Sequence, residues 1–259
     1  MELKNSTILI TGGTSGIGIE FVKQLTSLEA NIIITGRDTK KLELAKKQFP
    51  NVHTFQSDVS NAKEIEQLYQ QVTQQFPQLN IIINNAGIMR NMDLQDTNMS
   101  LEYITQEIDT NLKGTIRMVH QFLPHLKKQA SAAIVNVSSG LAFVPFTVSP
   151  VYSAAKAGMH AYTQTLRLQL KKTNIRVIEV APPGTDTPLN DIFKNELDSN
   201  MYMKVDKMVS VSIKGIVNSK MEIRPGMSNM MKIMSRIAPN FAINLLHNNV
   251  EKAKSKKTA

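Results

Sequence analysis

The stretch Thr11-Gly12-Gly13-Thr14-Ser15-Gly16-Ile17-Gly18 decides the fold of this 259-residue chain. It follows a β-branched run, Thr7–Ile10, and leads into an amphipathic stretch, Ile19–Leu28, which predicts a strand, a glycine-rich turn and a helix. Glycines let the backbone approach a pyrophosphate closely, and the N-terminus of a helix offers free N–H groups to an anion. A glycine-rich turn can also be purely structural, but its position between the first strand and the first helix favours a dinucleotide site.

Outward from this turn, short apolar runs alternate with longer amphipathic stretches, without internal repeats. Each run is almost uniformly apolar, which is typical of strands buried on both faces. The pattern predicts a single α/β domain spanning residues 1–259, with a doubly wound, Rossmann-like parallel sheet of about seven strands and helices on both faces. The expected strands are Thr7–Ile10, Asn31–Thr35, Val52–Gln56, Ile81–Asn84, Ala133–Val137 and Arg176–Val180, and further expected helices are Thr39–Gln48, Ala62–Phe76 and a long one within Leu101–Lys128.

Composition narrows the class of protein. Charged residues make up 20% and hydrophobic residues 42% of the chain, and no apolar run approaches the roughly 18 residues that a membrane span needs. Met1–Thr7 lacks the apolar core of a signal peptide, so we expect a cytoplasmic protein. The absence of cysteine excludes disulfides and thiolate chemistry. The net charge of +9 comes without interleaved aromatic residues, so we expect a solvated basic surface and no nucleic-acid partner.

The second expected strand ends in a segment that bears on the choice of cofactor, Gly36-Arg37-Asp38. In NAD-specific dinucleotide folds an acidic residue near this position bonds the ribose 2′-hydroxyl group. The guanidinium group of Arg37 can instead pair with a 2′-phosphate, which an acid would repel. Asp38 either caps the next helix, the interpretation that we favour, or is the ribose acid. The segment therefore favours NADP(H) over NAD(H).

Candidate catalytic groups follow the later strands. Tyr152 and Lys156 are four residues apart, so their side chains lie on one face of a helix. A free tyrosine has a pKa near 10, and a neighbouring ammonium group favours its phenolate form and lowers that pKa. Tyr152 can then exchange a proton with a carbonyl or alcohol oxygen. Ser138 and Ser139 follow the fifth expected strand.

Taken together, these segments resemble the short-chain dehydrogenase/reductase family from about Thr7 to Thr187. The resemblance implies a catalytic serine thirteen residues before the tyrosine, which selects Ser139 and leaves Ser138 as a structural hydroxyl. It also implies that Asn111 is catalytic and holds a water molecule that links Lys156 to solvent; the alternative is that Asn111 only bends a helix.

The same resemblance implies the residues that contact the cofactor. Asp58 and Val59 would face the adenine, Asn85-Ala86-Gly87 the adenosine ribose, Lys156 the nicotinamide ribose, and Thr187 the carboxamide. The full set is Gly12, Thr14, Ser15, Gly16, Ile17, Gly18, Arg37, Asp58, Val59, Asn85, Ala86, Gly87, Tyr152, Lys156 and Thr187, with no metal ligand. The Pro182-Pro183 pair, with Glu222–Gly226, is similar to a branch of oxidoreductases associated with bacterial D-alanylation operons.

The substrate is a small or medium, largely apolar carbonyl compound or alcohol in our first hypothesis. The connection Leu141–Val151 is unusually apolar, so part of it is expected to wall a pocket, with Pro188–Lys204 as a lid. Arg90 is a candidate group for binding a substrate carboxylate. A second hypothesis is a 3-oxoacyl-thioester reductase, and a third is an NADPH-binding regulator without turnover.

The C-terminal extension, residues 221–259, departs most from a minimal family member. Five apolar residues recur at helical spacing between Met227 and Ile237, followed by a second apolar segment after Pro239. These helices either cover the sheet edge and the pocket or form subunit contacts in a homodimer or homotetramer, which is the functional role that we favour. Contact with an anionic membrane is the least favoured alternative. The apolar residues are Met227, Met230, Met231, Met234, Ile237, Phe241, Ile243, Leu245 and Leu246.

Overall fold

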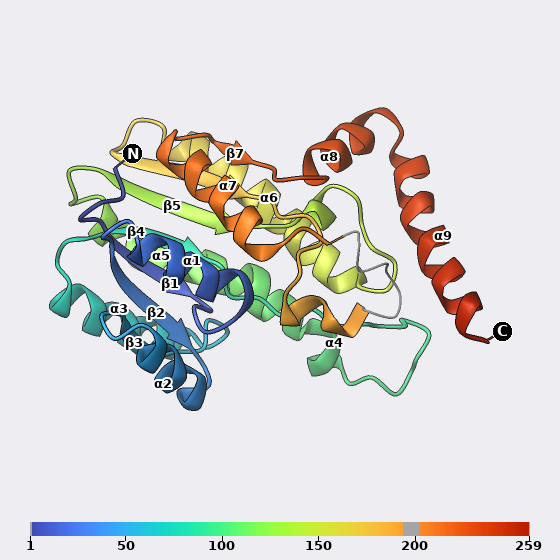
Figure 1. The fold of residues 1–259 in the computed structure, drawn as a ribbon, viewed down its shortest axis with the longest axis horizontal. Helices are drawn as coiled ribbons and strands as arrows, with labels where there is room; N and C mark the ends of the chain where they lie inside the picture. Colours follow the sequence, from blue (N-terminus) through green and yellow to red (C-terminus); the bar gives the residue numbers. More distant parts are fainter. Residues whose placement is uncertain (1, 194–201, 259) are drawn as a thin grey trace.

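Seven parallel strands form one twisted sheet in the order β3-β2-β1-β4-β5-β6-β7 (Figure 1). The computed structural model describes residues 2–193 and 202–258. The six apolar runs become the six long strands, which confirms the predicted fold class. The strands are β1 (Thr7–Thr11), β2 (Asn31–Gly36), β3 (His53–Gln56), β4 (Leu79–Asn84), β5 (Ala132–Val137), β6 (Ile175–Val180) and β7 (Glu222–Ile223).

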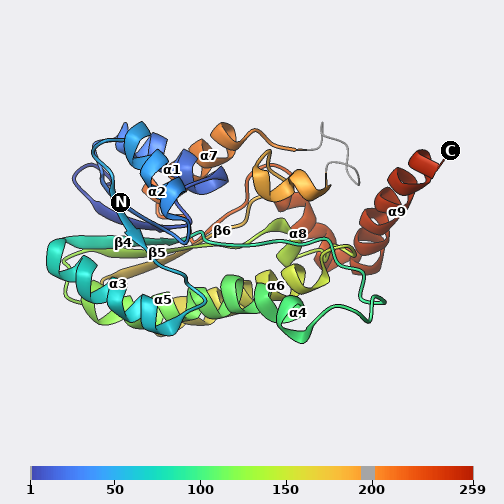
Figure 2. The same cartoon turned by 90° about the horizontal axis from the view of Figure 1, so that it is seen from below.

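Helices cover both faces of the sheet, as Figure 2 shows edge-on. Alternate residues of β1 enter two separate hydrophobic cores: Ile8 and Ile10 pack in one and Leu9 in the other, all fully buried. The uniformly apolar composition of the strands follows from this burial on both sides. One face carries α1 (Gly16–Thr26), α2 (Thr39–Gln48) and α7 (Val205–Val217), and the other carries α3 (Ala62–Gln75), α5 (Gly114–Leu126) and α6 (Pro150–Gln169).

The strand order places the ligand site. From β1 the chain builds outward to β2 and β3 on one side, and then returns to add β4, β5, β6 and β7 on the other side. The connections that leave β1 and β4 therefore diverge, and a crevice opens beyond the carboxyl ends of these strands. The glycine-rich turn after β1 and the segment Asn85–Gly87 after β4 lie at this position.

The long helix expected within Leu101–Lys128 is interrupted. The structure contains α4 (Leu101–Ile108), a π-helical segment (Asp109–Lys113) and α5 in direct succession. A π-helical turn is a local widening that is often found at functional sites, and this one contains Asn111. The short strand β7 lies at one edge of the sheet, beside β6; its two residues are too few for a hydrophobic pattern to identify.

The C-terminal helices α8 (Ser228–Ile237) and α9 (Pro239–Thr258) extend beyond the carboxyl ends of the strands (Figure 1). Val250 of α9 is fully buried in a small cluster with Phe146 and Phe193, away from the two main cores. The helices thus cover the pocket end of the molecule. Within residues 2–193 and 202–258, no helix has the length and apolar character needed to cross a membrane.

Candidate active site

The glycine-rich turn is tightly packed against the segment after β4. Gly12 has a positive φ of 65°, and a Cβ atom there would lie 2.9 Å from the Cα atom of Ala86. A Cβ atom on Gly18 would lie 2.1 Å from the carbonyl oxygen of Gly12, so the first turn of α1 approaches the turn too closely for any side chain. Such a cradle of bare backbone at the N-terminus of a helix fits a pyrophosphate group.

The side chain of Asn85 is hydrogen-bonded to the glycine-rich turn. Its Nδ2 atom donates to the carbonyl oxygens of Thr11 and Gly12, at 3.0 and 3.2 Å. The hydroxyl oxygen of Thr11 in turn accepts from the backbone N–H groups of Asn85 and Ala86, both at 3.0 Å. The Asn85 side chain therefore ties the two loops together, and backbone atoms of the segment are left to face the cavity.

The end of β2 places two basic side chains at one end of the cavity. Asp38 caps α2, since its Oδ1 atom accepts from the backbone N–H of Lys41 at 3.1 Å, which agrees with our favoured interpretation of Asp38. Arg37 is about half-exposed, with Nη1 3.7 Å from Oδ2 of Asp58. Lys41 also lines the cavity, although nothing in its sequence context singled it out. This end of the cavity thus contains Arg37 and Lys41 together with Asp38 and Asp58.

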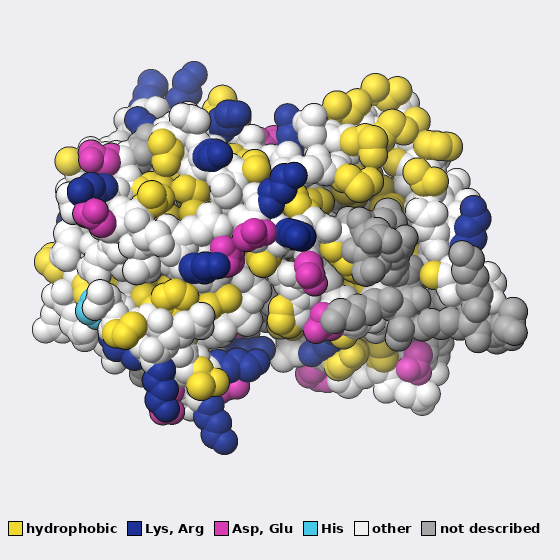
Figure 3. Space-filling view, viewed as in Figure 1, with side chains coloured by type: hydrophobic (Ala, Val, Ile, Leu, Met, Phe, Trp, Pro, Cys, Tyr) yellow, Lys and Arg dark blue, Asp and Glu magenta, His cyan; other side chains and the backbone are white. Residues whose placement is uncertain are grey.

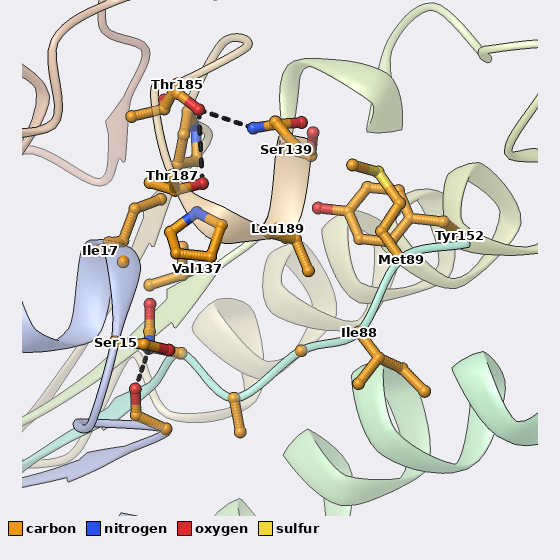
Figure 4. Close-up of a pocket in the computed structure, with 18 of the residues that line it drawn as sticks. Ser15, Ile17, Ile88, Met89, Val137, Ser139, Tyr152, Thr185, Thr187 and Leu189 are labelled. Carbon is orange, nitrogen blue, oxygen red and sulfur yellow. Dashed lines mark hydrogen bonds between the residues drawn. The ribbon is translucent and has the colours of Figure 1, made fainter. Parts of the chain in front are cut away.

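Ser139, Tyr152 and Lys156 come together from β5 and α6. Figure 4 shows Ser139, Tyr152 and Met89 on one side of the cavity and Ser15, Ile17 and Thr187 on the other. The side chain of Ser139 lies close enough to Tyr152 to lower its pKa. The Nζ atom of Lys156 lies 5.6 Å from the centre of the Tyr152 ring and donates to the carbonyl oxygen of Val137 at 2.8 Å.

Burial dominates the acid–base properties of this group. It raises the pKa of Tyr152 to about 12, and the nearby Ser139 side chain only partly opposes this rise. Burial also lowers the pKa of Lys156 to about 8, against the attraction of Glu179. The sequence predicts that nearby positive charge, including the Lys156 ammonium group, lowers the pKa of Tyr152 and favours its phenolate form. In the structure the larger effect is the removal of Tyr152 from water, so its hydroxyl group holds its proton at neutral pH.

Asn111 is fully buried, and both ends of its side-chain amide are occupied. Oδ1 accepts from the backbone N–H of Ile88 at 2.9 Å, and Nδ2 donates to the carbonyl oxygen of Ile88 at 2.8 Å. The π-helical segment thus anchors the loop after β4, immediately beside Gly87, where a Cβ atom would lie 3.0 Å from Oδ1 of Asn111. The expected role of Asn111, which is to hold a water molecule that links Lys156 to solvent, stays a prediction.

Three other expected residues occupy positions that clarify their roles. The hydroxyl group of Ser138 donates to the buried Glu179 at 2.5 Å, which agrees with a structural hydroxyl. Thr187 lies against the glycine-rich turn, because a Cβ atom on Gly16 would be 3.4 Å from the Cβ atom of Thr187. Arg90 does not point a free guanidinium group at the cavity: it donates to the carbonyl oxygen of Tyr103 at 2.6 Å and lies over that ring.

The cavity has a volume of about 480 Å³, and its wall near Tyr152 is apolar. The loop after β5 and the C-terminal helices build this wall together: a Cβ atom on Gly140 would lie 2.9 Å from Sδ of Met231. Of the expected lid, Pro188–Phe193 forms a short 3₁₀ helix, and residues 194–201 lie outside the described part. The apolar lining includes Ile88, Met89, Leu141, Phe146, Leu189, Phe193, Met227, Met231 and Leu246.

Known proteins share this fold and these motifs. The model of the short chain dehydrogenase family matches residues 6–198. An uncharacterised oxidoreductase, DltE, of Bacillus subtilis is 41% identical over 86% of this chain and 89% of its own length. A short-chain dehydrogenase from Burkholderia cenocepacia in complex with NADP aligns with a TM-score of 0.82 at 23% identity, covering 95% of this chain and 99% of the other.

A second solved structure, a short-chain dehydrogenase/reductase from Burkholderia phymatum in complex with NAD, aligns with a TM-score of 0.80 at 18% identity, covering 91% of this chain and 95% of that one. The chain therefore belongs to the short-chain dehydrogenase/reductase family of oxidoreductases. The expected resemblance is confirmed, and the relative DltE agrees with the expected branch. Because the two aligned structures carry different cofactors, the fold alone does not decide between NADP and NAD.

Proposed function

We propose that this protein is an NADP(H)-dependent oxidoreductase that interconverts a carbonyl compound and an alcohol. One observation carries the proposal: the glycine-rich cradle and Arg37 line the same cavity as Ser139 and Tyr152. The nicotinamide nucleotide, when bound, supplies or takes up a hydride. The backbone of the Gly12–Gly18 turn fits its pyrophosphate, and Arg37 and Lys41 fit a 2′-phosphate.

In the reductive direction the chain supplies the proton. The Tyr152 hydroxyl, protonated because it is buried, donates its proton to the carbonyl oxygen of the substrate. The Ser139 hydroxyl donates a hydrogen bond to the same oxygen and stabilises the charge that develops there. The Lys156 ammonium group then favours the phenolate left on Tyr152. A proton from solvent restores the phenol, and Asn111 is proposed to hold the water molecule that delivers it.

The lining of the cavity supports an apolar substrate. Aliphatic, aromatic and thioether groups line the same cavity as Tyr152, and methionine adapts to ligands of different shapes. Arg90 is engaged with Tyr103, so a small carboxylate substrate has no cation waiting for it there. The substrate class that we propose is therefore a small to medium ketone or aldehyde with apolar substituents. The cytoplasmic location stays a prediction.

The proposal can be tested by incubating the purified protein and NADPH with each member of a panel of carbonyl compounds. We expect absorbance-detected NADPH oxidation with apolar ketones or aldehydes and much slower oxidation with short keto acids. The panel includes a 3-oxoacyl thioester; preferential turnover of that compound would favour the thioester reductase. NADPH binding without turnover of any compound would favour the regulator and contradict the proposed activity.

An exposed apolar face on α8 and α9 supports the proposal that the protein is a homo-oligomer. Figure 3 shows hydrophobic side chains gathered over the region where Figure 1 places α8 and the start of α9. The side chains of Ile237 and Phe241 are 77% and 60% exposed, which is unusual for such large apolar groups. The exposed members of this face are Met227, Met230, Ile233, Ile237, Phe241 and Leu245.

Replacing Ile237 and Phe241 together with lysine is expected to dissociate the oligomer, because two charges would have to be buried at the contact. Light scattering measures the mass, and circular dichroism checks that the subunit is folded. Leu44→Lys is the control, since Leu44 is 63% exposed on α2, remote from this face. A folded double variant with the mass of the wild-type protein would contradict the proposed contact.

A further inference from the structure

A buried carboxyl group lies behind the candidate active site without lining its cavity. Glu107, in the last turn of α4, is 0% exposed and lies two residues before the π-helical segment that contains Asn111. Burying a carboxylate is costly unless hydrogen bonds or charges compensate for the lost water. The buried Glu107 carboxyl group therefore needs partners that compensate for the lost water.

Glu107 connects two segments that contribute to the cavity. Its Oε1 atom accepts from the backbone N–H of Arg90 at 2.6 Å, in the loop that follows β4. The backbone N–H of Tyr152 also interacts with this carboxyl group. The same loop is held from α6 as well, since the hydroxyl group of Ser149 donates to the carbonyl oxygen of Arg90 at 2.8 Å.

The first turn of α6 lies beside the Glu107 carboxyl group, because the backbone N–H of Tyr152 lowers its pKa. Ser149, at the N-cap position of α6, makes no side-chain capping bond to the N–H groups of the first turn. A negative charge near the N-terminus of a helix is stabilised by the helix dipole. Glu107 supplies such a charge from α4. The charge lies near the backbone of Tyr152, which bears the candidate catalytic hydroxyl group.

We propose that Glu107 is a positioning residue. Its carboxyl group fixes the position of Tyr152 relative to the loop that contains Arg90. It is not a catalytic residue in this scheme, because it does not line the cavity. The inference rests on the proposed function only in giving Tyr152 its role as proton donor. The contact itself is a property of the protein without substrate.

The charge of Glu107 is expected to change near neutral pH. Burial raises the pKa of Glu107 to about 7, against the N–H groups of Arg90 and Tyr152 and the charge of Arg90. Its Oε2 atom has no hydrogen-bonding partner of normal geometry among residues 2–193 and 202–258, which leaves an oxygen free to carry a proton. The facing ionisable groups are Arg90, whose guanidinium lies 4.0 Å from the Tyr103 ring centre, and Tyr152, whose pKa the Glu107 charge raises.

The contact can be tested by NMR on protein labelled with ¹⁵N-tyrosine, without substrate. The chain has five tyrosines, and the amide signal missing in Tyr152→Phe identifies Tyr152. We expect this signal to shift with a midpoint near pH 7 in the wild-type protein and to lose that shift in Glu107→Gln. Glutamine keeps an oxygen acceptor and removes only the charge. A Tyr152 amide that is unaffected by pH between about 5.5 and about 8.5 would overturn the proposal.

Glu102→Gln is the matched control, because Glu102 is an exposed residue of the same helix and its loss should leave the Tyr152 signal unchanged. Stability gives a second readout. The folded protein binds the Glu107 proton more tightly than the unfolded chain does, so the free energy of unfolding should fall as the pH rises from about 4.5 to about 7. Glu107→Gln should lack this contribution to stability. If that variant fails to fold, Glu107→Asp replaces it in both measurements. We then expect a weaker pH-dependent shift of the Tyr152 amide signal, and a shift equal to that of the wild-type protein would contradict the proposal.

Turnover provides the third readout, with the carbonyl or alcohol that the panel identifies. Removing the negative charge lowers the pKa of Tyr152, so the rising limb of the pH profile for alcohol oxidation should move to lower pH in Glu107→Gln. An unchanged profile would contradict an effect of Glu107 on Tyr152. Failure of every panel compound would count against the proposed function but leave the amide titration to decide the role of Glu107.

Discussion

Tyr152→Phe is expected to lower kcat by about 10²–10⁴-fold, the range usual for loss of a general acid. The substitution removes one hydroxyl group from a ring that is 94% buried, since Tyr152 is 6% exposed, and leaves the volume of the ring in place. NADPH affinity should therefore change by no more than about twofold. Stopped-flow or steady-state rates with the best panel substrate, together with fluorescence titration of NADPH, measure both quantities.

Tyr162→Phe is the matched control for this variant. Tyr162 lies on the same helix, and burial raises its pKa to about 12 as well, but it does not line the cavity. The same atom is removed in both variants, so a general effect of losing a buried hydroxyl group would appear in each. We expect the Tyr162 variant to keep nearly full activity. Retention of more than a tenth of the wild-type rate by Tyr152→Phe would remove Tyr152 from its proposed role.

Arg37→Ala is expected to raise the dissociation constant of NADPH by about 10- to 100-fold, because hydrogen bonds to charged groups contribute about 1.5–3 kcal/mol. The pairing of Arg37 with Asp58 at 3.7 Å is half-exposed, so little stability should be lost with it. NADH lacks the 2′-phosphate, and its affinity should change by about twofold or less. Fluorescence titration of both cofactors gives the ratio.

Two neighbouring lysines separate a specific contact from a general loss of positive charge. Lys41 lines the same end of the cavity, and Lys41→Ala should weaken NADPH binding to a smaller degree than Arg37→Ala. Lys40 is exposed and does not line the cavity, so Lys40→Ala should have no measurable effect. Equal losses for NADPH and NADH in Arg37→Ala would show that Arg37 does not recognise the phosphate.

The features predictable from the sequence are those that a local pattern encodes. Strands buried on both faces must be apolar at nearly every position, so runs such as Asn31–Thr35 indicate a parallel sheet. The spacing of Tyr152 and Lys156 alone places them on one helix face, and the strand order then brings Ser139 to them. Asp38 precedes a helical stretch in a position typical of an N-cap, and the structure shows that capping bond.

What escaped prediction depends on contacts between distant parts of the chain. The contact of Met231 with Gly140 joins residues far apart in the sequence, and no periodicity in either segment specifies the partner. The same holds for Glu107, an acid in an otherwise ordinary amphipathic helix. The pKa of Tyr152 depends on its burial, a property of the whole fold that the four-residue spacing to Lys156 cannot report.

The division of the cavity wall has a consequence for protein engineering. Residues of the glycine-rich turn and the end of β2 lie in the first fifth of the chain, whereas Met227, Met231 and Leu246 come from its last helices. A library restricted to these three positions would vary the shape of the apolar wall while leaving the nucleotide end untouched. Methionine has the long flexible side chain that tolerates exchange for leucine or phenylalanine with small rearrangements. If the protein has the proposed activity, selection from such a library should change the preferred carbonyl compound without altering the choice of coenzyme.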